Sequence, residues 1–136
     1  MTAIETVLEF IEAINAHNIN KIVGLLTPDH RFTDSLGKVI DGRRHVRDAW
    51  QGYFAIVPDY RIEVAETYAD GQRLVVLGTA AGTYIKDCRL ISDRSWKIPA
   101  AWRGVVAGHR LAEWQAYVDH EPLRKAMSSN RPPQAD

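Results

Sequence analysis

The sequence predicts an α+β fold, a cone-shaped α+β barrel in which three N-terminal helices pack into a strongly curved antiparallel or mixed sheet. Before residue 58, three segments repeat apolar residues at every third or fourth position, which is the period of one helix face. From residue 60 to residue 118, apolar and polar residues largely alternate, as they do in strands. Gly78 and Gly82 interrupt the longest apolar strand, and interior glycines often mark a sharp bend. A sheet bent over helices leaves a cone with an open mouth, so a pocket is expected.

The N-terminal half is predicted to contain three helices and two short strands. The first helix starts after Thr2, which has the spacing of a capping box with Glu5. The second helix buries one face of residues 22–26 and ends before Pro28. The remaining elements of this half are strand 30–34, strand 38–40 and a third helix, which is capped by Asp41, ends at Pro58 and buries Val46, Trp50, Tyr53 and Val57.

The segment after Pro58 is predicted to form a long hairpin. Residues 69–72 carry a turn signal that joins strand 60–64 to strand 74–85. The polar residues 86–95 follow, and two interpretations stay open for them. They form either a lid over the mouth of the cone or a long hairpin loop.

The end of the chain is predicted to hold two strands, 98–106 and 111–118, and a short helix that starts at Pro122. We find no internal repeat and no linker. Residues 1–127 are therefore predicted to form a single domain. Residues 128–136 are polar and contain proline, and they are predicted to form a disordered tail.

Composition excludes several classes of function. The chain has 136 residues, of which 46% are apolar, and its 17 basic and 17 acidic side chains cancel. This balance argues against a nucleic-acid surface, which normally carries a basic excess, and against a polybasic membrane patch. Cys88 is the single cysteine, so an internal disulfide is impossible, and Glu5 and Glu9 interrupt any secretory signal. We expect a cytoplasmic protein that binds no nucleic acid and no membrane.

Three stretches resemble the nuclear transport factor 2-like superfamily, which includes ketosteroid isomerases, scytalone dehydratase and SnoaL-like polyketide cyclases. Residues 10–18 and 22–26 resemble its paired N-terminal helices, and residues 32–37 resemble the strand and turn after them. Residues 108–119 are similar to its last strand, which often reads Gly-Lys-Ile-x-Glu-x-Trp. The resemblance covers roughly residues 2–127. It implies the cone-shaped fold and a homodimer formed through the outer face of the sheet, but this fold hosts enzymes, binding modules and transport factors alike.

Asp34 is the first candidate catalytic residue. The resemblance places it where ketosteroid isomerases carry their carboxylate base, which removes a proton beside a carbonyl group. The alternative is that Asp34 only closes the turn before Gly37. The isomerase also needs two hydrogen-bond donors for the oxyanion, and the matching positions are Phe10 and Ala100, which cannot donate. We therefore set ketosteroid isomerase activity itself aside.

Glu113 is the second candidate catalytic residue. SnoaL-like cyclases carry a catalytic aspartate on the last strand, where this chain has Gln115, and often a histidine where it has Glu113. Successive side chains of a strand point to opposite faces of the sheet. With the register that the resemblance implies, Glu113, Gln115 and Tyr117 point toward the cone. Glu113 would then share the pocket with Asp34. The alternative is that Glu113 pairs with Arg103 on the neighbouring strand.

The remaining candidates are a histidine and a group of aromatic side chains. His30 lies on the same strand face as Asp34 and is a candidate proton partner. Trp114 is expected on the outer face, at the dimer interface. No metal-binding spacing of histidine or cysteine occurs, so neither a metal nor another cofactor is expected. The candidate ligand-binding residues are Trp50, Tyr53, Trp102, Gln115 and Tyr117.

Three interpretations of function follow from these residues. The first is a cofactor-free acid/base enzyme of the isomerase, dehydratase or cyclase type, acting on a small hydrophobic carbonyl or hydroxyl compound. The second is a module that binds a hydrophobic ligand without converting it. The third is a structural dimer whose cone is filled by its own side chains. The expected partners are accordingly a small hydrophobic molecule and a second copy of the chain.

Overall fold

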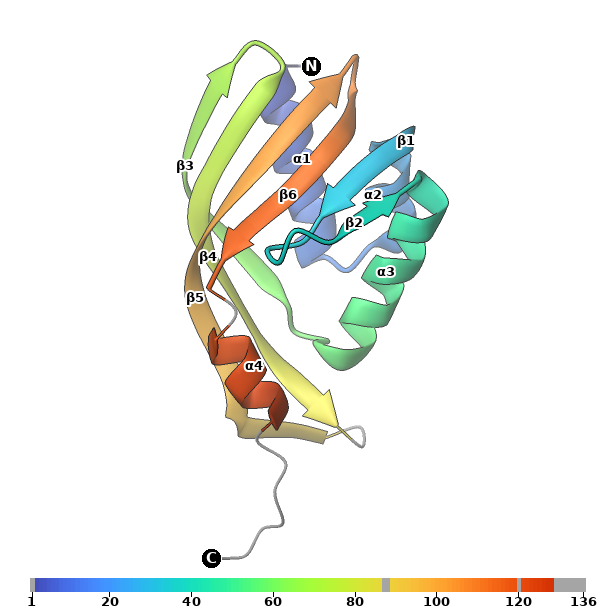
Figure 1. The fold of residues 1–136 in the computed structure, drawn as a ribbon. Helices are drawn as coiled ribbons and strands as arrows, with labels where there is room; N and C mark the ends of the chain where they lie inside the picture. The colour runs from blue at the N-terminus through green and yellow to red at the C-terminus, as the bar shows by residue number, and fades with distance from the viewer. Residues whose placement is uncertain (1, 87–88, 120, 129–136) are drawn as a thin grey trace, which may run out of the picture.

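The computed structural model describes residues 2–86, 89–119 and 121–128 (Figure 1). The helices are α1 (Ala3–Asn15), α2 (Ile19–Gly24), α3 (Arg43–Ile56) and α4 (Glu121–Ser128). The strands are β1 (Leu26–Thr33), β2 (Val39–Asp41), β3 (Arg61–Asp70), β4 (Arg73–Lys86), β5 (Arg89–Ala107) and β6 (Arg110–Val118).

The first turns of α1 and α3 differ in how well the sequence predicted them. At α1 the capping box is present: the Glu5 backbone N–H donates to the Thr2 hydroxyl at 3.1 Å, and the Thr2 N–H donates to the Glu5 carboxylate at 2.7 Å. At α3 the predicted cap is wrong, because Gly42 precedes the helix with a φ of 92°. Asp41 instead pairs with Arg31 at 3.0 Å.

The strands of the described part form one six-stranded sheet in the order β2–β1–β6–β5–β4–β3. β1 pairs with β6 in parallel, whereas the other neighbours pair antiparallel. β1 starts earlier than predicted, so Leu26, expected in the second helix, and Pro28 both belong to the sheet. The sheet curls around α1 without closing, and α3 lies across its open side (Figure 1). The predicted fold, three helices packed in a strongly curved mixed sheet, is confirmed.

Gly78 shows how the sequence permits this curvature. The pairing of β3 with β4 shifts between Val64 and Glu66, which leaves one extra residue on β3 opposite Gly78. A Cβ atom at Gly78 would lie 1.9 Å from the carbonyl oxygen of Glu63. Only glycine allows the two backbones to approach so closely, and such a bulge increases the local twist.

The long hairpin loop that was one interpretation of residues 86–95 is replaced by strand in the described residues. β4 and β5 stay paired almost to their connection, with Thr83 opposite Ser95 and Ile85 opposite Leu90, so the loop interpretation is wrong there, and the lid stays a prediction. α4 packs against β5 on one side of this long hairpin (Figure 1). Residues 87–88, which include Cys88, and 129–136 of the predicted tail lie outside the described residues.

The core fills the concave side of the sheet at its α1 end. Phe10 of α1 is completely buried and meets Trp114 of β6 edge-on, with ring centroids 5.1 Å apart. Trp114 in turn stacks on Trp102 of β5 at 6.2 Å. α1 and α2 do not reach the other end of the concave face, where a cavity remains beside α3. Among the described residues, no helix is long and apolar enough to span a membrane.

Candidate functional site

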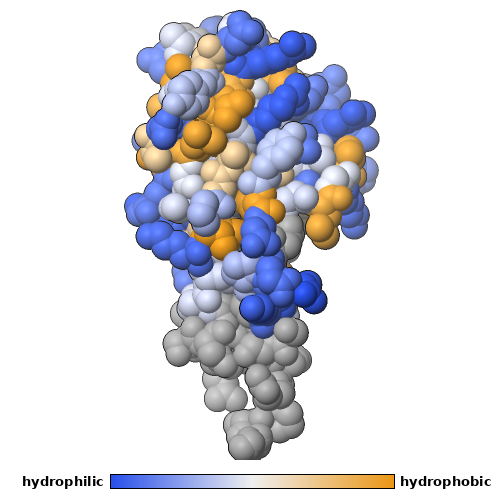
Figure 2. Space-filling model, turned by 60° about the vertical axis from the view of Figure 1, so that its left-hand side comes forward, coloured by the Kyte–Doolittle hydropathy of each residue, from blue (hydrophilic) through white to orange (hydrophobic). Residues whose placement is uncertain are grey.

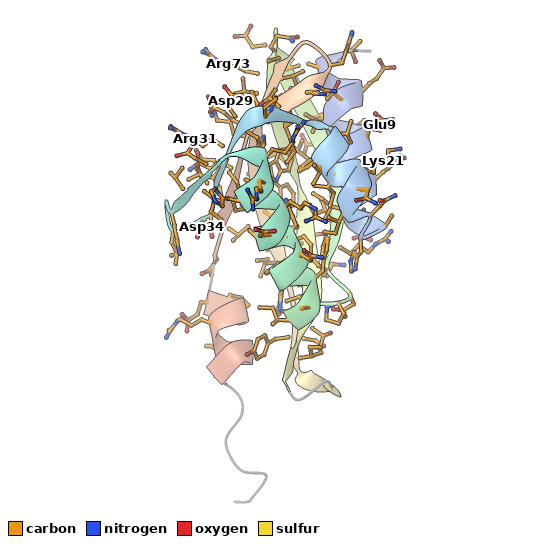
Figure 3. The ribbon with its side chains drawn as sticks, turned by 90° about the vertical axis from the view of Figure 1, so that its right-hand side faces the viewer. Glu9, Lys21, Asp29, Arg31, Asp34 and Arg73 are labelled. Carbon is orange, nitrogen blue, oxygen red and sulfur yellow. The ribbon has the colours of Figure 1, made fainter. Side chains whose placement is uncertain are left out.

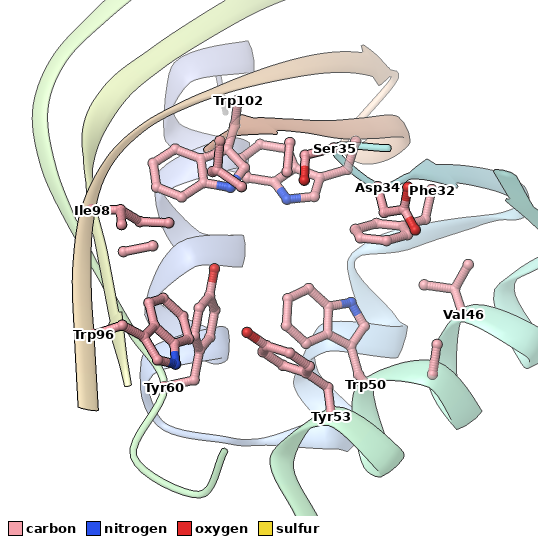
Figure 4. A pocket seen from close by; sticks show the side chains of 15 residues that line it. Phe32, Asp34, Ser35, Val46, Trp50, Tyr53, Tyr60, Trp96, Ile98 and Trp102 are labelled. Atoms are coloured by element: carbon pink, nitrogen blue, oxygen red, sulfur yellow. The ribbon is translucent and has the colours of Figure 1, made fainter. Parts of the chain in front are cut away.

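The open part of the cone holds a cavity of about 290 Å³. This volume lies near the lower limit of ordinary small-molecule pockets, which is about 300 Å³. Side chains of β1, α3, β4, β5 and β6 line it, and most of them are apolar (Figure 4). The largest lining side chains are aromatic, and they are Trp50, Tyr53, Tyr60, Trp96, Trp102 and Trp114.

Asp34 is the only charged side chain among the described residues that line the cavity. It follows β1 directly and sits at the edge of the site. Other charged side chains lie on the outer surface, such as Glu9 and Lys21, which pair at 3.7 Å (Figure 3). A single formal negative charge therefore faces an aromatic, largely apolar space.

The Asp34 carboxylate is held in place by the turn that follows it. Its Oδ1 accepts hydrogen bonds from the backbone N–H groups of Leu36 and Lys38, both at 2.9 Å. This is the turn-closing role that the sequence offered as an alternative. Oδ2 accepts no hydrogen bond from any described residue. The turn thus orients the carboxylate while leaving one oxygen free, so closing the turn and lining the cavity are compatible.

The predicted inward face of β6 is wrong. The pairing of β5 with β6 shifts between Val105 and Val106, which inserts an extra residue after Leu111 and inverts the alternation beyond it. Leu111 and Trp114 are consequently both buried. The residues of β6 that line the cavity are Trp114, Ala116 and Val118.

Glu113, Gln115 and Tyr117 therefore lie on the outer face of the sheet and do not line the cavity. Glu113 forms an ion pair with Arg103 at 2.9 Å, as the alternative interpretation had it. Tyr117 is 51% exposed. Trp114, which was expected at the outer face, is instead 1% exposed in the core. Glu113, Gln115 and Tyr117 are therefore not part of the proposed site.

His30 does not reach the cavity either. It is completely buried, and its Nδ1 lies 2.7 Å from the carbonyl oxygen of Leu111. Burial lowers the pKa of His30 below the usual value for histidine, although the hydrogen bond to Leu111 acts in the opposite sense. A neutral imidazole that donates to a carbonyl group accounts for this position. The prediction that His30 is a proton partner of Asp34 has no support in this geometry.

Of the predicted ligand-binding residues, Trp50, Tyr53 and Trp102 line the cavity. Sequence reasoning missed Tyr60 and Trp96. Trp96 fell between the polar segment 86–95 and the predicted strand 98–106, although it continues the inward alternation of Ile98 and Trp102 along β5. Gly82 was the signal in the sequence that could have indicated the position of Trp96. A Cβ atom at Gly82 would lie 3.2 Å from Cζ2 of Trp96, so the glycine makes room for the indole ring.

Tyr53 and Tyr60 form the polar part of the aromatic wall. Their ring centroids lie 5.0 Å apart and the rings are nearly perpendicular, at 81°. Figure 4 shows both hydroxyl groups pointing into the space between Trp50, Trp96 and the late strands. Burial raises the pKa of both hydroxyls above the usual value for tyrosine, and for Tyr53 the neighbouring Tyr60 and Asp59 add to the effect. Both side chains therefore remain protonated at neutral pH.

The end of α1 holds Tyr60 in position. The imidazole Nε2 of His17 lies 3.0 Å from the Tyr60 carbonyl oxygen. Asn15 binds the backbone of Ile62 twice, donating to its carbonyl oxygen at 2.9 Å and accepting from its N–H at 2.8 Å. His17 also stacks on Phe54 of α3, with centroids 4.2 Å apart. These contacts join the start of β3 to both helices, so Tyr60 has a defined place in the cavity.

No group of three histidine, cysteine, aspartate or glutamate side chains within the described part of the chain is arranged to hold a metal ion. The chemistry on offer comes from one carboxylate, two phenolic hydroxyls and indole N–H groups. A carboxylate with a free oxygen can take up a proton, and a protonated hydroxyl can donate a hydrogen bond. The surrounding walls are largely apolar, and apolar surroundings strengthen such polar interactions.

Solved structures with the same fold share little sequence with this chain. A protein of Shewanella denitrificans, provisionally named a SnoaL-like polyketide cyclase, is 17% identical, with a TM-score of 0.80 over 93% of this chain and 97% of that one. An NTF2-like protein of unknown function from Burkholderia pseudomallei is 23% identical, with a TM-score of 0.76 over 93% and 98%. A hypothetical protein of Catenulispora acidiphila with a ketosteroid isomerase-like fold, solved in complex with trimethylamine, is 16% identical, with a TM-score of 0.78 over 90% and 92%.

At these identities the likeness shows the fold and nothing finer. A comparison with curated proteins found no match. The SnoaL-like domain model, by contrast, matches residues 7–114, which include most of α1, the Asp34 turn, α3 and most of the sheet. Because this match covers most of the chain, the protein belongs to the SnoaL-like domain family.

Proposed function

We propose that the protein is a cofactor-free acid/base enzyme of the isomerase, dehydratase or cyclase type. Its substrate would be a small hydrophobic carbonyl or hydroxyl compound. The observation that carries this proposal is Asp34, the one carboxylate among the described residues that line the aromatic cavity. One of its oxygens is free while the turn orients the other. Active sites commonly place a positioned carboxylate at a largely apolar cavity.

The proposed step is removal of a proton from a carbon atom beside a carbonyl group. Oδ2 of Asp34 takes the proton, the electron pair of the C–H bond forms a C=C bond, and the carbonyl π pair moves onto oxygen. Glu113 lies outside the cavity, so no second carboxylate of the described residues is available there. Asp34 itself must therefore return the proton, either to another carbon or to a departing hydroxyl group.

The two alternatives differ from this proposal in measurable ways. A structural dimer with a filled cone is disfavoured by the cavity of about 290 Å³. A binding module for a hydrophobic ligand would use the same aromatic walls but would have no need of the free carboxylate oxygen. Binding of an apolar ketone without any exchange of its protons would favour that second interpretation.

The test is exchange of the α-protons of β-tetralone, a flat apolar ketone, in deuterium oxide. In Asp34→Asn, the exchange rate followed by proton NMR is expected to fall by about a hundredfold or more, because general bases contribute at least that factor. The asparagine oxygen can still accept both turn hydrogen bonds, so the melting temperature should change little. Glu113→Gln is the matched control and should exchange at the wild-type rate. Equal exchange by Asp34→Asn and the wild type would refute the base assignment.

We also propose that two copies of the chain pair through the outer face of the sheet. The strand register places Leu77, Ala101 and Tyr117 side by side on this face. Figure 2 shows apolar side chains among polar ones over the outer side of the sheet. Half-exposed apolar side chains of β3 and β4 add to the surface, and they include Tyr68 and Val75, which lie opposite each other.

Ala101→Arg tests the pairing, because it places a charge at the centre of the face. Sedimentation equilibrium should give twice the chain mass for the wild type and the single chain mass for this variant. Val39→Arg, at an exposed position on the edge strand β2, should keep the wild-type mass. A monomeric wild type would overturn the pairing.

A further inference from the structure

We propose that Tyr53 and Tyr60 together hold the substrate oxygen on which negative charge develops when Asp34 removes a proton. The assignment rests on the proposed function and narrows its substrate class. The substrate must carry a hydrogen-bond-accepting oxygen at the far side of the cavity from the hydrogen that leaves.

This assignment rests on the positions of the hydrogen-bond donors and the base, which lie on opposite sides of the cavity. Tyr53 projects from α3 and Tyr60 from the residue before β3, and both hydroxyls point into the same space (Figure 4). Asp34 lies on the other side of that space, at the end of β1 (Figure 4). A flat molecule between them can direct its oxygen to the tyrosines and its acidic C–H bond to Asp34.

Both hydroxyls are free to bind a ligand. Neither forms a hydrogen bond with another described residue, and neither oxygen is sealed off by the surrounding atoms. Trp96 differs in this respect, because its Nε1 is fully buried without a partner and a ligand cannot reach it. A buried tyrosine normally finds a partner for its hydroxyl. Two adjacent tyrosines whose accessible hydroxyls have no partner among the described residues can therefore both donate to a ligand in the cavity.

The two hydroxyls are also suited to a developing negative charge. Their positions are fixed before any ligand enters, by the near-perpendicular packing of the rings and by the contacts of Tyr60 with α1. Donors that are already in place need no reorganisation during the reaction, and in a cavity poor in water they act strongly. The positions at which ketosteroid isomerases place their donors hold Phe10 and Ala100 here, so the tyrosine pair would be a separate solution on different elements.

The test uses two probes, benzisoxazole and its nitro derivative, which lose the same hydrogen but differ in the stability of the leaving oxygen. A base removes the proton from the carbon atom that is bonded to the ring nitrogen. The N–O bond breaks as the nitrile forms, and the oxygen departs as a phenolate. A nitro group para to this oxygen stabilises the phenolate by itself. Donors that hold the oxygen therefore matter most for unsubstituted benzisoxazole.

Tyr53→Phe and Tyr60→Phe are each expected to lower kcat/KM for benzisoxazole by about tenfold to a hundredfold, the loss of one hydrogen bond to a charged oxygen. The decrease for the nitro derivative should be clearly smaller. Tyr117→Phe, a matched change on the outer face, should leave both values unchanged. Asp34→Asn should abolish turnover of both probes.

The outcomes separate this assignment from the proposed function. If Asp34→Asn abolishes turnover but the tyrosine variants change both probes by the same factor, or not at all, the donor assignment is overturned and the base assignment stands. A merely structural role of the tyrosines would produce that equal change. If wild type and Asp34→Asn do not differ, the proposed function fails first, and the donor assignment fails with it.

Discussion

Trp114→Ala is expected to lower the free energy of unfolding by about 3–5 kcal/mol, the usual cost of truncating a buried aromatic side chain to alanine. Trp114 is 1% exposed and joins α1 to the sheet through its contacts with Phe10 and Trp102. Its removal leaves a void in the core and also takes away one wall of the candidate site. Urea denaturation followed by circular dichroism measures the change.

The same experiment tests the inverted face of β6. In the strictly alternating register, Trp114 would lie on the outer face, and its truncation would cost less than about 1 kcal/mol. A loss of that size would contradict the bulge between β5 and β6. Leu36→Ala is a suitable control, because Leu36 is 77% exposed and should change the stability by no more than about 0.5 kcal/mol.

Gly78→Ala is expected to lower the free energy of unfolding by about 3 kcal/mol, the upper end of the ordinary cost of overpacking. The added methyl group would lie 1.9 Å from the Glu63 carbonyl oxygen. That oxygen belongs to the backbone of β3, so relief requires the strand to move and the bulge to rearrange. Thermal unfolding and urea denaturation both report the loss.

Gly52→Ala provides the matched control for this substitution. Gly52 lies within α3, and nothing within 4 Å would meet its Cβ atom. Alanine there should raise the stability by about 0.5–1 kcal/mol, because glycine is the poorer residue inside a helix. Equal stability changes for the two variants would contradict the close approach of β3 and β4 at Gly78.

Asp34 illustrates a candidate residue that the sequence located well. Its place between a strand and a turn was visible from the residues around it, and its interpretation as a turn-closing residue concerned local structure, whereas its interpretation as a base came from the family resemblance. The structure shows that the two are compatible, since Oδ1 serves the turn and Oδ2 is free. Local sequence is enough here, because the hydrogen-bond partners lie within four residues.

Glu113, Gln115 and Tyr117 illustrate the opposite case. Alternation along β6 predicts which residues share a face, but one extra residue exchanges the two faces for the rest of the strand. The bulge arises from the pairing of β6 with β5, and the sequence of β6 alone carries no sign of it. Three of the eight residues proposed from the sequence for the site were therefore placed on the wrong side of the sheet.

The sequence by itself determined the fold class, the helical faces and the family resemblance, because helix and strand periods are properties of neighbouring residues. The tertiary structure decided which side chains meet in the cavity. Tyr60 and Trp96 are far apart in the chain and become neighbours only when the sheet bends, with centroids 6.0 Å apart. That bend depends on glycines that let backbones and large side chains approach across strands. Contacts of this kind depend on strand register, and register is settled only when the whole sheet packs against its helices.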